Sequence, residues 1–307
     1  MNDGEEAFME PIYSRPGVRH FFILGAPDPE MMRIGRILGI GIRLGLVAGY
    51  GRALCEDDPV HTKSAYNATG VSGAVPPDTP LVLVECGFES DPPGAVAHRI
   101  DHHNPGDPGF DMGPSEFWSG SSIGQLVEYL HRFSPSNSKV NRVLEESLRP
   151  LSEDLRYAAA ADHCLPHAYQ GRCPGIDPLH LERWRALSRA QFQGRSVGSI
   201  KYSFKRARAV IRSAQQDSKH CLNIAGNTMV IIHGHVPGLK DASAQLGIPV
   251  EHHVIHRPTG TPKAGIFGAP PGVVEAWMSE RAPSLGLQDI YGAPLRGYAG
   301  GYWRSPA

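Results

Sequence analysis

The sequence predicts an α/β protein: a domain with a parallel sheet comes first, a helical connector follows, and a smaller α/β domain ends the chain. Short apolar runs alternate with helical patterns from His20 to Phe133, which is the order expected for β-α-β units. Helical patterns then prevail, and strand patterns return only after about residue 220. We therefore expect four segments: a flexible leader at 1–19, a large domain at 20–195, a helical linker at 196–220 and a smaller domain at 221–307.

The first strand is expected at 20–24. This short run stops at Gly25 and is followed by a proline-rich turn, and short apolar runs that end in turn-forming residues are typical of buried strands. A helix is expected next, because Pro29 suits a first helical turn and apolar residues recur at helical spacing as far as Leu38. Three further runs are expected to add strands to the same parallel sheet, at 42–48, 81–84 and 95–100.

The rest of the chain is predicted mainly from helical spacing. Four segments carry this spacing, at 123–133, 138–161, 178–192 and 199–214. Two runs rich in β-branched residues predict strands of the smaller domain, at 229–232 and 250–255.

Composition narrows the classes of function. Thirty basic residues balance thirty-one acidic ones, which gives a formal net charge of -1. No global field therefore attracts nucleic acid or an anionic membrane, and a polyanion needs a local patch. The five cysteines are scattered and odd in number, which favours a reducing compartment. The most apolar window, 34–51, contains Arg36 and Arg43, and the N-terminal segment is acidic, so we expect a cytoplasmic protein without a membrane segment.

Acidic side chains and histidines follow the predicted strands. Two acids come after the first strand, one ends the third, and an Asp-His-His sequence follows the next; these residues are Asp28, Glu30, Glu85, Asp101, His102 and His103. Because the carboxyl ends of parallel strands meet at one edge of a sheet, we expect these side chains to converge. Carboxylate and imidazole ligands together suit Mg²⁺ or Mn²⁺ better than thiolate-preferring metals. For any single acid, an ordinary role as a turn or cap residue is equally open.

The pattern around these residues resembles the DHH phosphoesterase superfamily, which includes bacterial single-strand exonucleases, family II pyrophosphatases and small oligonucleotide phosphodiesterases. The segment Arg99–Asn104 matches the name-giving motif, and Ser121–Val127 resembles the helix start that follows it. Ala161-Asp162-His163 resembles the later metal-binding aspartate of the family, reached through a helix of small residues. The resemblance spans most of the chain in the right order, and its centre is the specific part.

Three positions depart from the family pattern. Leu24 stands where the first motif usually has a histidine, and Glu30 and Glu85 stand where aspartates are usual. Both glutamates can still ligate a metal, from a shifted backbone. These departures leave open whether one or two metal ions bind. They also keep a second hypothesis open, a catalytically degenerate nucleotide-binding or regulatory protein on the same scaffold.

A second match lies near the C-terminus. The segment Arg296–Tyr302 resembles the glycine-rich basic motif that closes the smaller domain of the family, with aromatic residues in place of the usual histidine. Glycines let backbone amides approach an anion, and arginine binds phosphate through two parallel hydrogen bonds. The resemblance therefore implies substrate binding by Arg296, Gly297, Gly300 and Gly301. A tight turn in a flexible terminal tail is the alternative.

Taken together, the resemblance implies a metal-dependent phosphoesterase that uses Mn²⁺ or Mg²⁺ to hydrolyse a phosphate ester of a nucleotide or a short single-stranded nucleic acid. The implied metal ligands are Asp28, Glu30, Glu85, Asp101, His102 and Asp162. The implied catalytic residues are Asp101, His102, His103 and Arg296, and the last two would stabilise charge on the phosphoryl oxygens. A monomer and a homodimer both remain open.

A zinc site is the alternative to a Mn²⁺ or Mg²⁺ site. His163, Cys164, His167 and Cys173 offer the ligand types that zinc prefers, although two of them are adjacent and Pro166 interrupts the segment. This hypothesis predicts stoichiometric zinc in the purified protein.

Overall fold

The computed structural model describes residues 19–62, 64–134, 139–255 and 260–303. The chain divides into two compact units. The first unit consists of residues 1–101 and 122–153, and the second unit consists of residues 102–121 and 154–307. The expected leader lies outside the described residues, except for Arg19. The domain boundaries expected at 195 and 220 stay a prediction.

The first unit contains a sheet whose main strands are parallel, as predicted. The strand order is β3-β2-β1-β5-β6, and β4 pairs with β2. Strands β2, β1, β5 and β6 run parallel to one another, whereas β3 and β4 pair antiparallel with β2. The strands are β1 (His20–Leu24), β2 (Val47–Cys55), β3 (Asp58–Pro59), β4 (Gly70–Val71), β5 (Leu81–Val84) and β6 (Val96–Ile100). Strands β1 and β5 are buried along their whole length, as expected for interior strands of a parallel sheet.

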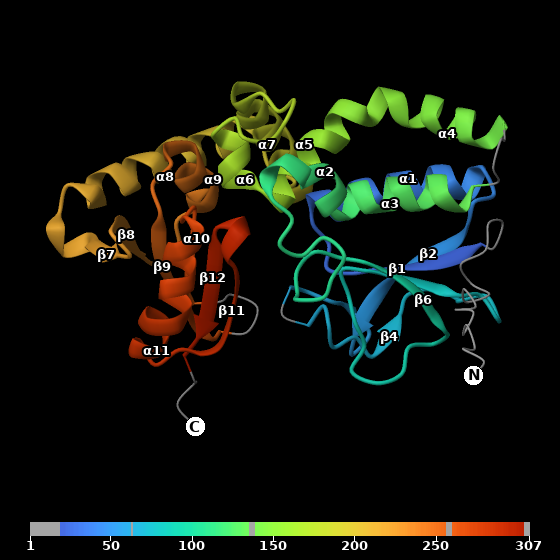
Figure 1. The fold of residues 1–307 in the computed structure, drawn as a ribbon, viewed down its shortest axis with the longest axis horizontal. Coiled ribbons are helices and arrows are strands. Elements are labelled where there is room, and N and C mark those ends of the chain that lie inside the picture. Colours follow the sequence, from blue (N-terminus) through green and yellow to red (C-terminus); the bar gives the residue numbers. More distant parts are fainter. Residues whose placement is uncertain (1–18, 63, 135–138, 256–259, 304–307) are drawn as a thin grey trace, which may run out of the picture. The chain divides into compact units, whose positions relative to one another are not determined.

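Helices cover one face of this sheet (Figure 1). Helices α1 (Pro29–Arg43) and α3 (Ser122–Phe133) lie side by side, and α4 (Lys139–Leu148) packs against α1. The side chain of Asp28 accepts a hydrogen bond of 2.6 Å from the amide three residues later and so caps α1. Pro29 is the first helical residue, as the sequence predicted.

The two faces of β1 bury different side chains. Phe22 meets Tyr129 of α3 edge to face, with ring centroids 5.6 Å apart. Phe21 and Ile23 point to the opposite face, where they join a cluster with Val60 and other residues of the loops after β3. This alternation is what a strand imposes on successive side chains, and it anchors β1 in two apolar cores.

The position predicted for the second strand, 42–48, is wrong. Ile42 and Arg43 end α1, and β2 begins only at Val47, where it pairs with His20 of β1. Gly45 lies between them with φ +71, a left-handed conformation that glycine adopts without steric cost. The apolar run therefore combines the last turn of a helix, a glycine turn and the start of a strand.

The second unit begins its architecture with helices. They are α2 (Phe117–Gly120), α5 (Ser152–His163), α6 (Leu165–Tyr169), α7 (Pro178–Gln193) and α8 (Val197–Gln215). Asp177 caps α7, and Ser196 caps α8, each through its side chain. Helix α8 occupies most of the segment expected as a helical linker. Short 3₁₀ turns complete the description, at Pro114–Glu116, Arg149–Leu151, Ser218–His220 and Pro294–Arg296.

A second sheet of six strands, in the order β11-β12-β10-β9-β8-β7, completes this unit. The strands are β7 (Cys221–Ile224), β8 (Asn227–His233), β9 (Val250–Ile255), β10 (Pro262–Phe267), β11 (Gln288–Ala293) and β12 (Tyr298–Tyr302). Only β8 and β9 are parallel; the other described neighbours are antiparallel. The strands expected at 229–232 and 250–255 are confirmed by β8 and β9.

Helices pack on both faces of the second sheet. Helix α8 and α9 (Leu239–Leu246) share one apolar cluster with β8 and β9. On the other face, α10 (Pro271–Ala276) continues into a π-helical turn at Trp277–Arg281 and then α11 (Ala282–Ser284), and the Trp277 side chain is fully buried. The chain is therefore α/β in both units, with a parallel sheet in the first and a mixed sheet in the second.

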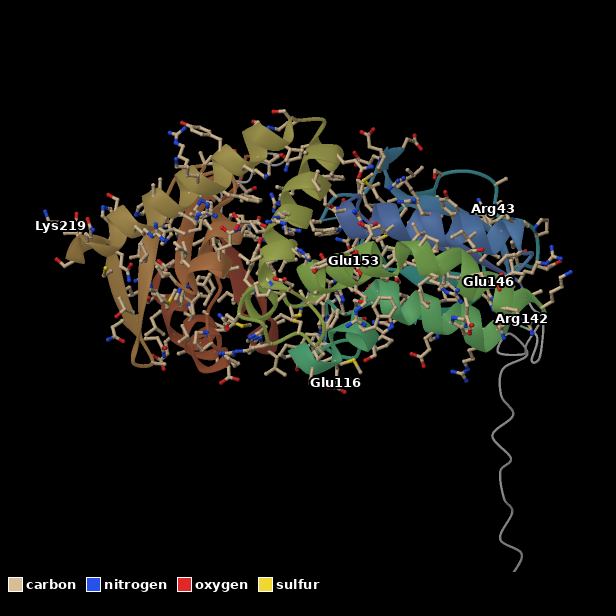
Figure 2. The ribbon with its side chains drawn as sticks, turned by 90° about the horizontal axis from the view of Figure 1, so that it is seen from above. Arg43, Glu116, Arg142, Glu146, Glu153 and Lys219 are labelled. Carbon is tan, nitrogen blue, oxygen red and sulfur yellow. The ribbon has the colours of Figure 1, made fainter. Side chains whose placement is uncertain are left out.

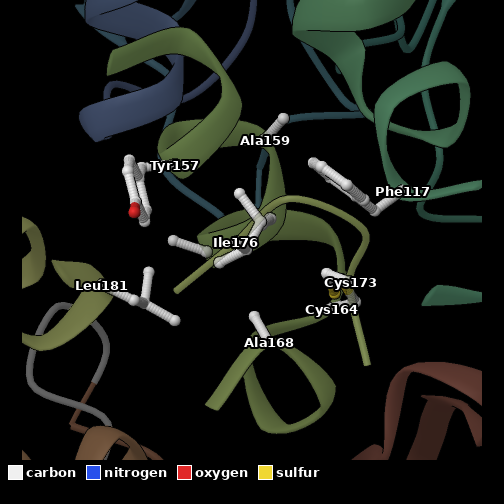
Figure 3. Close-up of a cluster of buried hydrophobic side chains, with 10 residues drawn as sticks. Phe117, Tyr157, Ala159, Cys164, Ala168, Cys173, Ile176 and Leu181 are labelled. Carbon is white, nitrogen blue, oxygen red and sulfur yellow. The ribbon is translucent and has the colours of Figure 1, made fainter. Parts of the chain in front are cut away.

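A further apolar cluster of the second unit joins α2 and α5–α7 (Figure 3). It contains Phe117, Tyr157, Cys164, Cys173 and Leu181 among others. Because this cluster lies directly behind the end of α5, it fixes the backbone from which Asp162 and His163 project. In the described part of the chain, no helix combines the length and the apolar character needed to cross a membrane.

Candidate metal centre and catalytic site

The first unit brings the ends of β1 and β5 together. The amide of Gly25 donates a hydrogen bond of 2.8 Å to the carbonyl of Val84. A Cβ atom on Gly25 would lie only 2.1 Å from the carbonyl oxygen of Glu85. Only glycine fits this approach, so the turn after β1 and the end of β5 depend on each other.

Glu85 has an unusual backbone conformation. Its φ is +50, in the left-handed region that costs residues other than glycine, asparagine and aspartate roughly 1 kcal/mol or more. Its amide donates to the carbonyl of Ile100 at 3.0 Å, and the residue is 7% exposed. This conformation turns the side chain out of the line of β5 at the carboxyl end of the sheet.

Glu30 is the second buried carboxylate of the first unit. It is 2% exposed, and its Oε1 atom accepts a hydrogen bond of 3.0 Å from the amide of Ile123 in the first turn of α3. The carboxylate therefore lies at the amino end of a helix, where negative charge is stabilised. A carboxylate oxygen of Glu30 and one of Glu85 lie within 4.8 Å of each other. The structure therefore brings these two predicted ligands together.

Asp28 and Asp101 have defined contacts of a different kind. Asp28 caps α1, as described above. Asp101 is fully buried, and its carboxylate accepts a hydrogen bond from the Tyr66 hydroxyl, with distances of 3.0 and 3.1 Å to its two oxygens. Its backbone amide and carbonyl both bond to the side chain of Gln125. Neither Tyr66 nor Gln125 was predicted as a site residue: Tyr66 stands in no recognisable motif, and Gln125 was noted only as part of the segment Ser121–Val127.

His102 is the central histidine of the second unit. It is fully buried. Its Nδ1 atom lies 3.2 Å from the carbonyl oxygen of Gly120, and its Nε2 atom lies 3.0 Å from Oδ2 of Asp162. Burial and the charge of Arg296 lower the pKa of His102 to about 3. The ring is therefore neutral at pH 7 and carries one proton.

His163 extends this contact to a second carbonyl. Its Nε2 atom lies 2.8 Å from the carbonyl oxygen of Met112, and its Nδ1 atom lies 3.4 Å from Nδ1 of His102. Burial and the charge of Arg296 lower the pKa of His163 to about 4. Because a carbonyl only accepts hydrogen bonds, we assign the His163 proton to Nε2, which leaves Nδ1 as an acceptor.

The proton of His102 can lie on either nitrogen, because both face acceptors: Nδ1 faces the Gly120 carbonyl and Nδ1 of His163, and Nε2 faces the Asp162 carboxylate. With the proton on Nδ1, the electron pair of Nε2 faces Asp162. A ring oriented by a hydrogen bond from one nitrogen, with the other nitrogen available, is the usual state of a metal-ligating histidine.

Gly120 must be small for this arrangement to form. A Cβ atom there would lie 2.7 Å from Cε1 of His163 and 2.9 Å from Cβ of Met112. The glycine thus allows the imidazole of His163 to pack against the backbone that orients His102. The sequence indicated His163 only as part of the segment Ala161-Asp162-His163 and as a candidate zinc ligand, and its contact with His102 was missed.

Arg296 holds the backbone of three site residues. Its guanidinium donates to the carbonyls of His163, His102 and Asp162, at 3.2, 3.1 and 3.1 Å, and its side chain is 6% exposed. Its Nη2 atom also lies 3.6 Å from Oδ2 of Asp162. Burial acts to raise the pKa of Asp162, but His102 and Arg296 outweigh burial, and the pKa lies well below its usual range.

His103 lies beside His102. The two ring centroids are 4.5 Å apart, and ligand atoms of the two rings lie within 4.8 Å of each other. His103 is half-buried. It is thus the more accessible of the two histidines in the predicted motif.

The predicted glycines near the C-terminus have packing roles. Gly297 has φ +73, and a Cβ atom there would lie 2.9 Å from the carbonyl oxygen of Ala269. Gly300 and Gly301 belong to β12, where a Cβ atom on Gly300 would lie 2.6 Å from the Tyr291 hydroxyl. The segment is an interior strand of the second sheet, so the alternative of a flexible tail is wrong for it. Substrate binding by these glycines stays a prediction.

The residues of the zinc alternative are arranged differently. Cys164 and Cys173 are 2% and 1% exposed and belong to the apolar cluster of Figure 3. The hydrogen bond from Cys173 and burial both raise the pKa of the Cys164 thiol, which disfavours the thiolate that binds zinc. Among the described residues, neither cysteine belongs to a group of close potential metal ligands.

Comparisons with known proteins find similarity only among solved structures. No known family's sequence model matches the chain, and no curated protein matches it. Among solved structures, the chain is similar to PggH, a pGpG-specific phosphodiesterase from Vibrio cholerae, with a TM-score of 0.39 and 9% identity over 93% of each chain. A TM-score and an identity this low do not support an inference about function.

Proposed function

We propose that this protein is a divalent-metal-dependent phosphoesterase that hydrolyses a phosphate ester of a nucleotide or a short single-stranded nucleic acid. One observation carries the proposal. The Nε2 atom of His102 faces a carboxylate oxygen of Asp162 at 3.0 Å, and Nδ1 of the same ring lies 3.2 Å from the Gly120 carbonyl oxygen. We assign the ring proton to Nδ1, so that Nε2 and the carboxylate both offer electron pairs, an arrangement that fits a bound cation.

The proposed ligands are those that the DHH resemblance implies: Asp28, Glu30, Glu85, Asp101, His102 and Asp162. The first unit offers Glu30 and Glu85 as a close pair, and the second offers His102 and Asp162 as another. Asp101 and His102 are consecutive, so one peptide bond joins the two groups of ligands. A set of oxygen and imidazole donors without thiolate suits Mn²⁺ or Mg²⁺.

The side chains are in the protonation states that this chemistry requires. When bound, the ion supplies Lewis acidity, because it lowers the pKa of a water molecule and draws charge from phosphoryl oxygens. His102 stays neutral at pH 7, since its pKa is about 3, and so presents an electron pair. Asp162 stays ionised, since its pKa is well below the usual range. In the proposal, His103 donates a hydrogen bond to a phosphoryl oxygen.

In this proposal Arg296 acts on the site through the backbone. Its donors already bond to the carbonyls of His102, Asp162 and His163. The arginine therefore fixes the positions of two proposed ligands and of the histidine that orients one of them. Phosphate binding by Arg296, which the sequence implies, predicts a different kinetic effect of its removal, and the two roles can be separated by experiment.

A direct test is hydrolysis of a 5′-phosphorylated dinucleotide as a function of Mn²⁺ concentration. We expect Asp162→Asn to lose activity by at least about 100-fold, since it weakens a metal ligand. Asp217→Asn is the matched control, because Asp217 is an exposed aspartate that caps a short turn. Activity that survives Asp162→Asn, or activity that no divalent metal stimulates, would overturn the proposal.

The second candidate function is a nucleotide-binding or regulatory protein without hydrolytic activity. Leu24 supports it: at 1% exposure it fills the apolar core at the position where the DHH resemblance implies a histidine. This candidate predicts tight binding of the dinucleotide with no turnover under Mn²⁺ or Mg²⁺. Metal-stimulated turnover by the wild-type protein, abolished in Asp162→Asn, would exclude it.

A further inference from the structure

A groove of about 590 Å³ lies in the first unit and is lined by residues of α1, by Tyr50 and Arg52 of β2, and by Ser147, Pro150 and Leu151 at and after the end of α4. Three arginines line it: Arg36 and Arg43 come from α1, and Arg52 comes from β2. No aspartate or glutamate is among its lining residues. The groove is therefore strongly basic, although the whole chain has a net charge of -1.

These three guanidinium groups have no acidic partner in the described part of the chain. The ion pairs there involve other arginines, and none includes Arg36, Arg43 or Arg52. The Nη1 atom of Arg52 is buried and has no hydrogen-bond partner. A buried donor without a partner costs about 1 to 3 kcal/mol, more when charged. Such a group in a native fold calls for a ligand or an ion that completes it.

The floor of the groove is kept open by two glycines on one face of α1. A Cβ atom on Gly35 would lie 3.9 Å from the Tyr50 hydroxyl, and one on Gly39 would lie 3.9 Å from Nη1 of Arg43. Both distances are ordinary contact distances, so an alanine at either position would fit without a clash and would take up space in the groove. Glycine is unfavourable inside a helix by about 1 kcal/mol relative to alanine. The two glycines thus leave space at a cost to helix stability.

The chemistry of the groove selects phosphate. Guanidinium groups bind phosphate oxygens through pairs of parallel hydrogen bonds, and a volume of a few hundred Å³ suits a small ligand. Tyr50 adds an aromatic ring that is 42% exposed, and such a ring stacks on a nucleobase. We propose that this groove binds the phosphate groups of a nucleotide, with Arg36, Arg43 and Arg52 as the anion ligands.

The phosphate can come from two sources. Leu24 and Met31 are among the lining residues, and they are next in the chain to Gly25 and Glu30. The second phosphate of a dinucleotide substrate is one source, and a separate nucleotide that occupies the groove by itself is the other. The inference goes beyond the proposed hydrolysis, because anion binding here requires neither a metal nor catalysis.

The test measures binding of three probes, pyrophosphate, GMP and a 5′-phosphorylated guanine dinucleotide, by calorimetry without metal. Using Asp162→Asn as the background removes hydrolysis, so failure of the proposed enzymatic function does not affect the result. We expect Arg52→Gln to weaken binding of at least one probe about tenfold or more, the effect of losing one charge-assisted hydrogen bond. We also expect the wild-type affinity to fall steeply as salt is raised.

Two further variants keep the result interpretable. Gly39→Glu places a carboxylate four residues before Arg43, a pair that stabilises a helix, so this variant should fold at least as well as wild type and still lose the anion. Arg142→Gln is the matched control, because Arg142 is exposed on α4 and does not line the groove, whereas Arg43 does. Figure 2 labels both arginines. We expect Arg142→Gln to bind all probes as wild type does.

The outcomes decide the proposal and the source of the phosphate. Loss of dinucleotide binding alone in Arg52→Gln and Gly39→Glu identifies the groove as part of the substrate site. Equal loss of GMP or pyrophosphate binding identifies a site for a separate ligand. No binding of any probe by the parent protein, unchanged binding in Gly39→Glu, or an equal loss in Arg142→Gln would overturn the proposal.

Discussion

The guanidinium of Arg296 donates a hydrogen bond of 3.1 Å to the carbonyl of Asp162, 134 residues earlier in the chain. The same guanidinium bonds to the carbonyls of His102 and His163. One side chain from the end of the second sheet thus fixes two segments that are far apart in sequence. The identity of the residue, with several donors in one plane, is what makes three such bonds compatible.

Replacing Arg296 should therefore weaken metal binding. We expect Arg296→Gln to lower the affinity for Mn²⁺ by about 10- to 100-fold, as loss of an outer contact to metal ligands commonly does, and to lower kcat while leaving KM for the dinucleotide nearly unchanged. Arg296→Lys should recover only part of the affinity, because an ammonium cannot reach three carbonyls in one plane. Calorimetric titration with Mn²⁺ and steady-state kinetics measure both effects.

Arg156→Gln is the control for the loss of an arginine that bonds a carbonyl, since Arg156 donates to the carbonyl of Pro174. It should leave Mn²⁺ affinity unchanged. A rise in KM for Arg296→Gln with unchanged Mn²⁺ affinity would instead support direct phosphate binding by Arg296.

The close approach at Gly25 predicts a large effect of a small change. Gly25→Ala adds a Cβ atom 2.1 Å from the carbonyl oxygen of Glu85, so the backbone must move. We expect a loss of stability of about 2 kcal/mol or more, together with a loss of Mn²⁺ binding through displacement of Glu85. Thermal unfolding and metal titration check the two parts. Gly198→Ala is the control, because nothing lies within 4 Å of that position, and an alanine inside α8 should be neutral or stabilising.

Glu251 should make the stability of the second unit depend on pH. Burial alone would raise its pKa, but hydrogen bonds from His253, Arg281 and Trp277 lower it to about 2, from an ordinary value of 4.5. The carboxylate is fully buried. Its contribution to stability is therefore complete above about pH 4.5 and is lost as the pH falls toward 2. The shift corresponds to about 3 kcal/mol.

The measurement is the free energy of unfolding in urea between pH 7 and pH 2. We expect Glu251→Gln to be less stable than wild type at pH 7 and to lose less stability on acidification. Parallel pH profiles for the two proteins would show that Glu251 does not have this role.

The two buried cysteines test the zinc alternative. Because burial and the neighbouring thiol raise the pKa of Cys164, we expect purified protein to contain no stoichiometric zinc. We also expect Cys173→Ala to keep the Mn²⁺ affinity of the wild type. The variant should be less stable, because it removes a buried side chain from the apolar cluster. Elemental analysis and metal titration provide the measurements. One zinc per chain, lost in Cys173→Ala, would restore the zinc hypothesis.

Elements with a strong local signal could be predicted from the sequence. The strand at 20–24 coincides with β1, the strand at 250–255 coincides with β9, and Pro29 begins α1. Each of these signals is local, either a short apolar run bounded by turn residues or a proline beside a capping aspartate. The strand predicted at 42–48 was misplaced because the end of α1 and the start of β2 are both apolar and form one continuous run.

The glycine-rich strand β12 could not be predicted in the same way. Glycine weakens a strand, so Tyr298–Tyr302 shows no strand signal of its own. It is a strand because β10 and β11 flank it and because its glycines admit the Tyr291 ring. These reasons involve contacts between distant segments, which a pattern in one segment does not record.

The candidate site, too, was predicted only where its residues are distinctive in the sequence. The sequence pointed to His102 and Asp162, which the structure places 3.0 Å apart. It did not point to the carbonyls of Gly120 and Met112, which orient the imidazoles, because every residue has a carbonyl and none is distinctive in a sequence. Asp28 and Asp101 were predicted as ligands from their positions after predicted strands and from the DHH resemblance, and that role stays a prediction.

The left-handed backbone of Glu85 sets stability against the proposed metal binding at a single position. Glycine would adopt φ +50 without strain, so Glu85→Gly should melt at a higher temperature than the natural chain while lacking the carboxylate. A selection that rewards heat resistance alone would favour the loss of this proposed ligand. An engineer who stabilises this fold should therefore hold position 85 constant and seek improvement elsewhere.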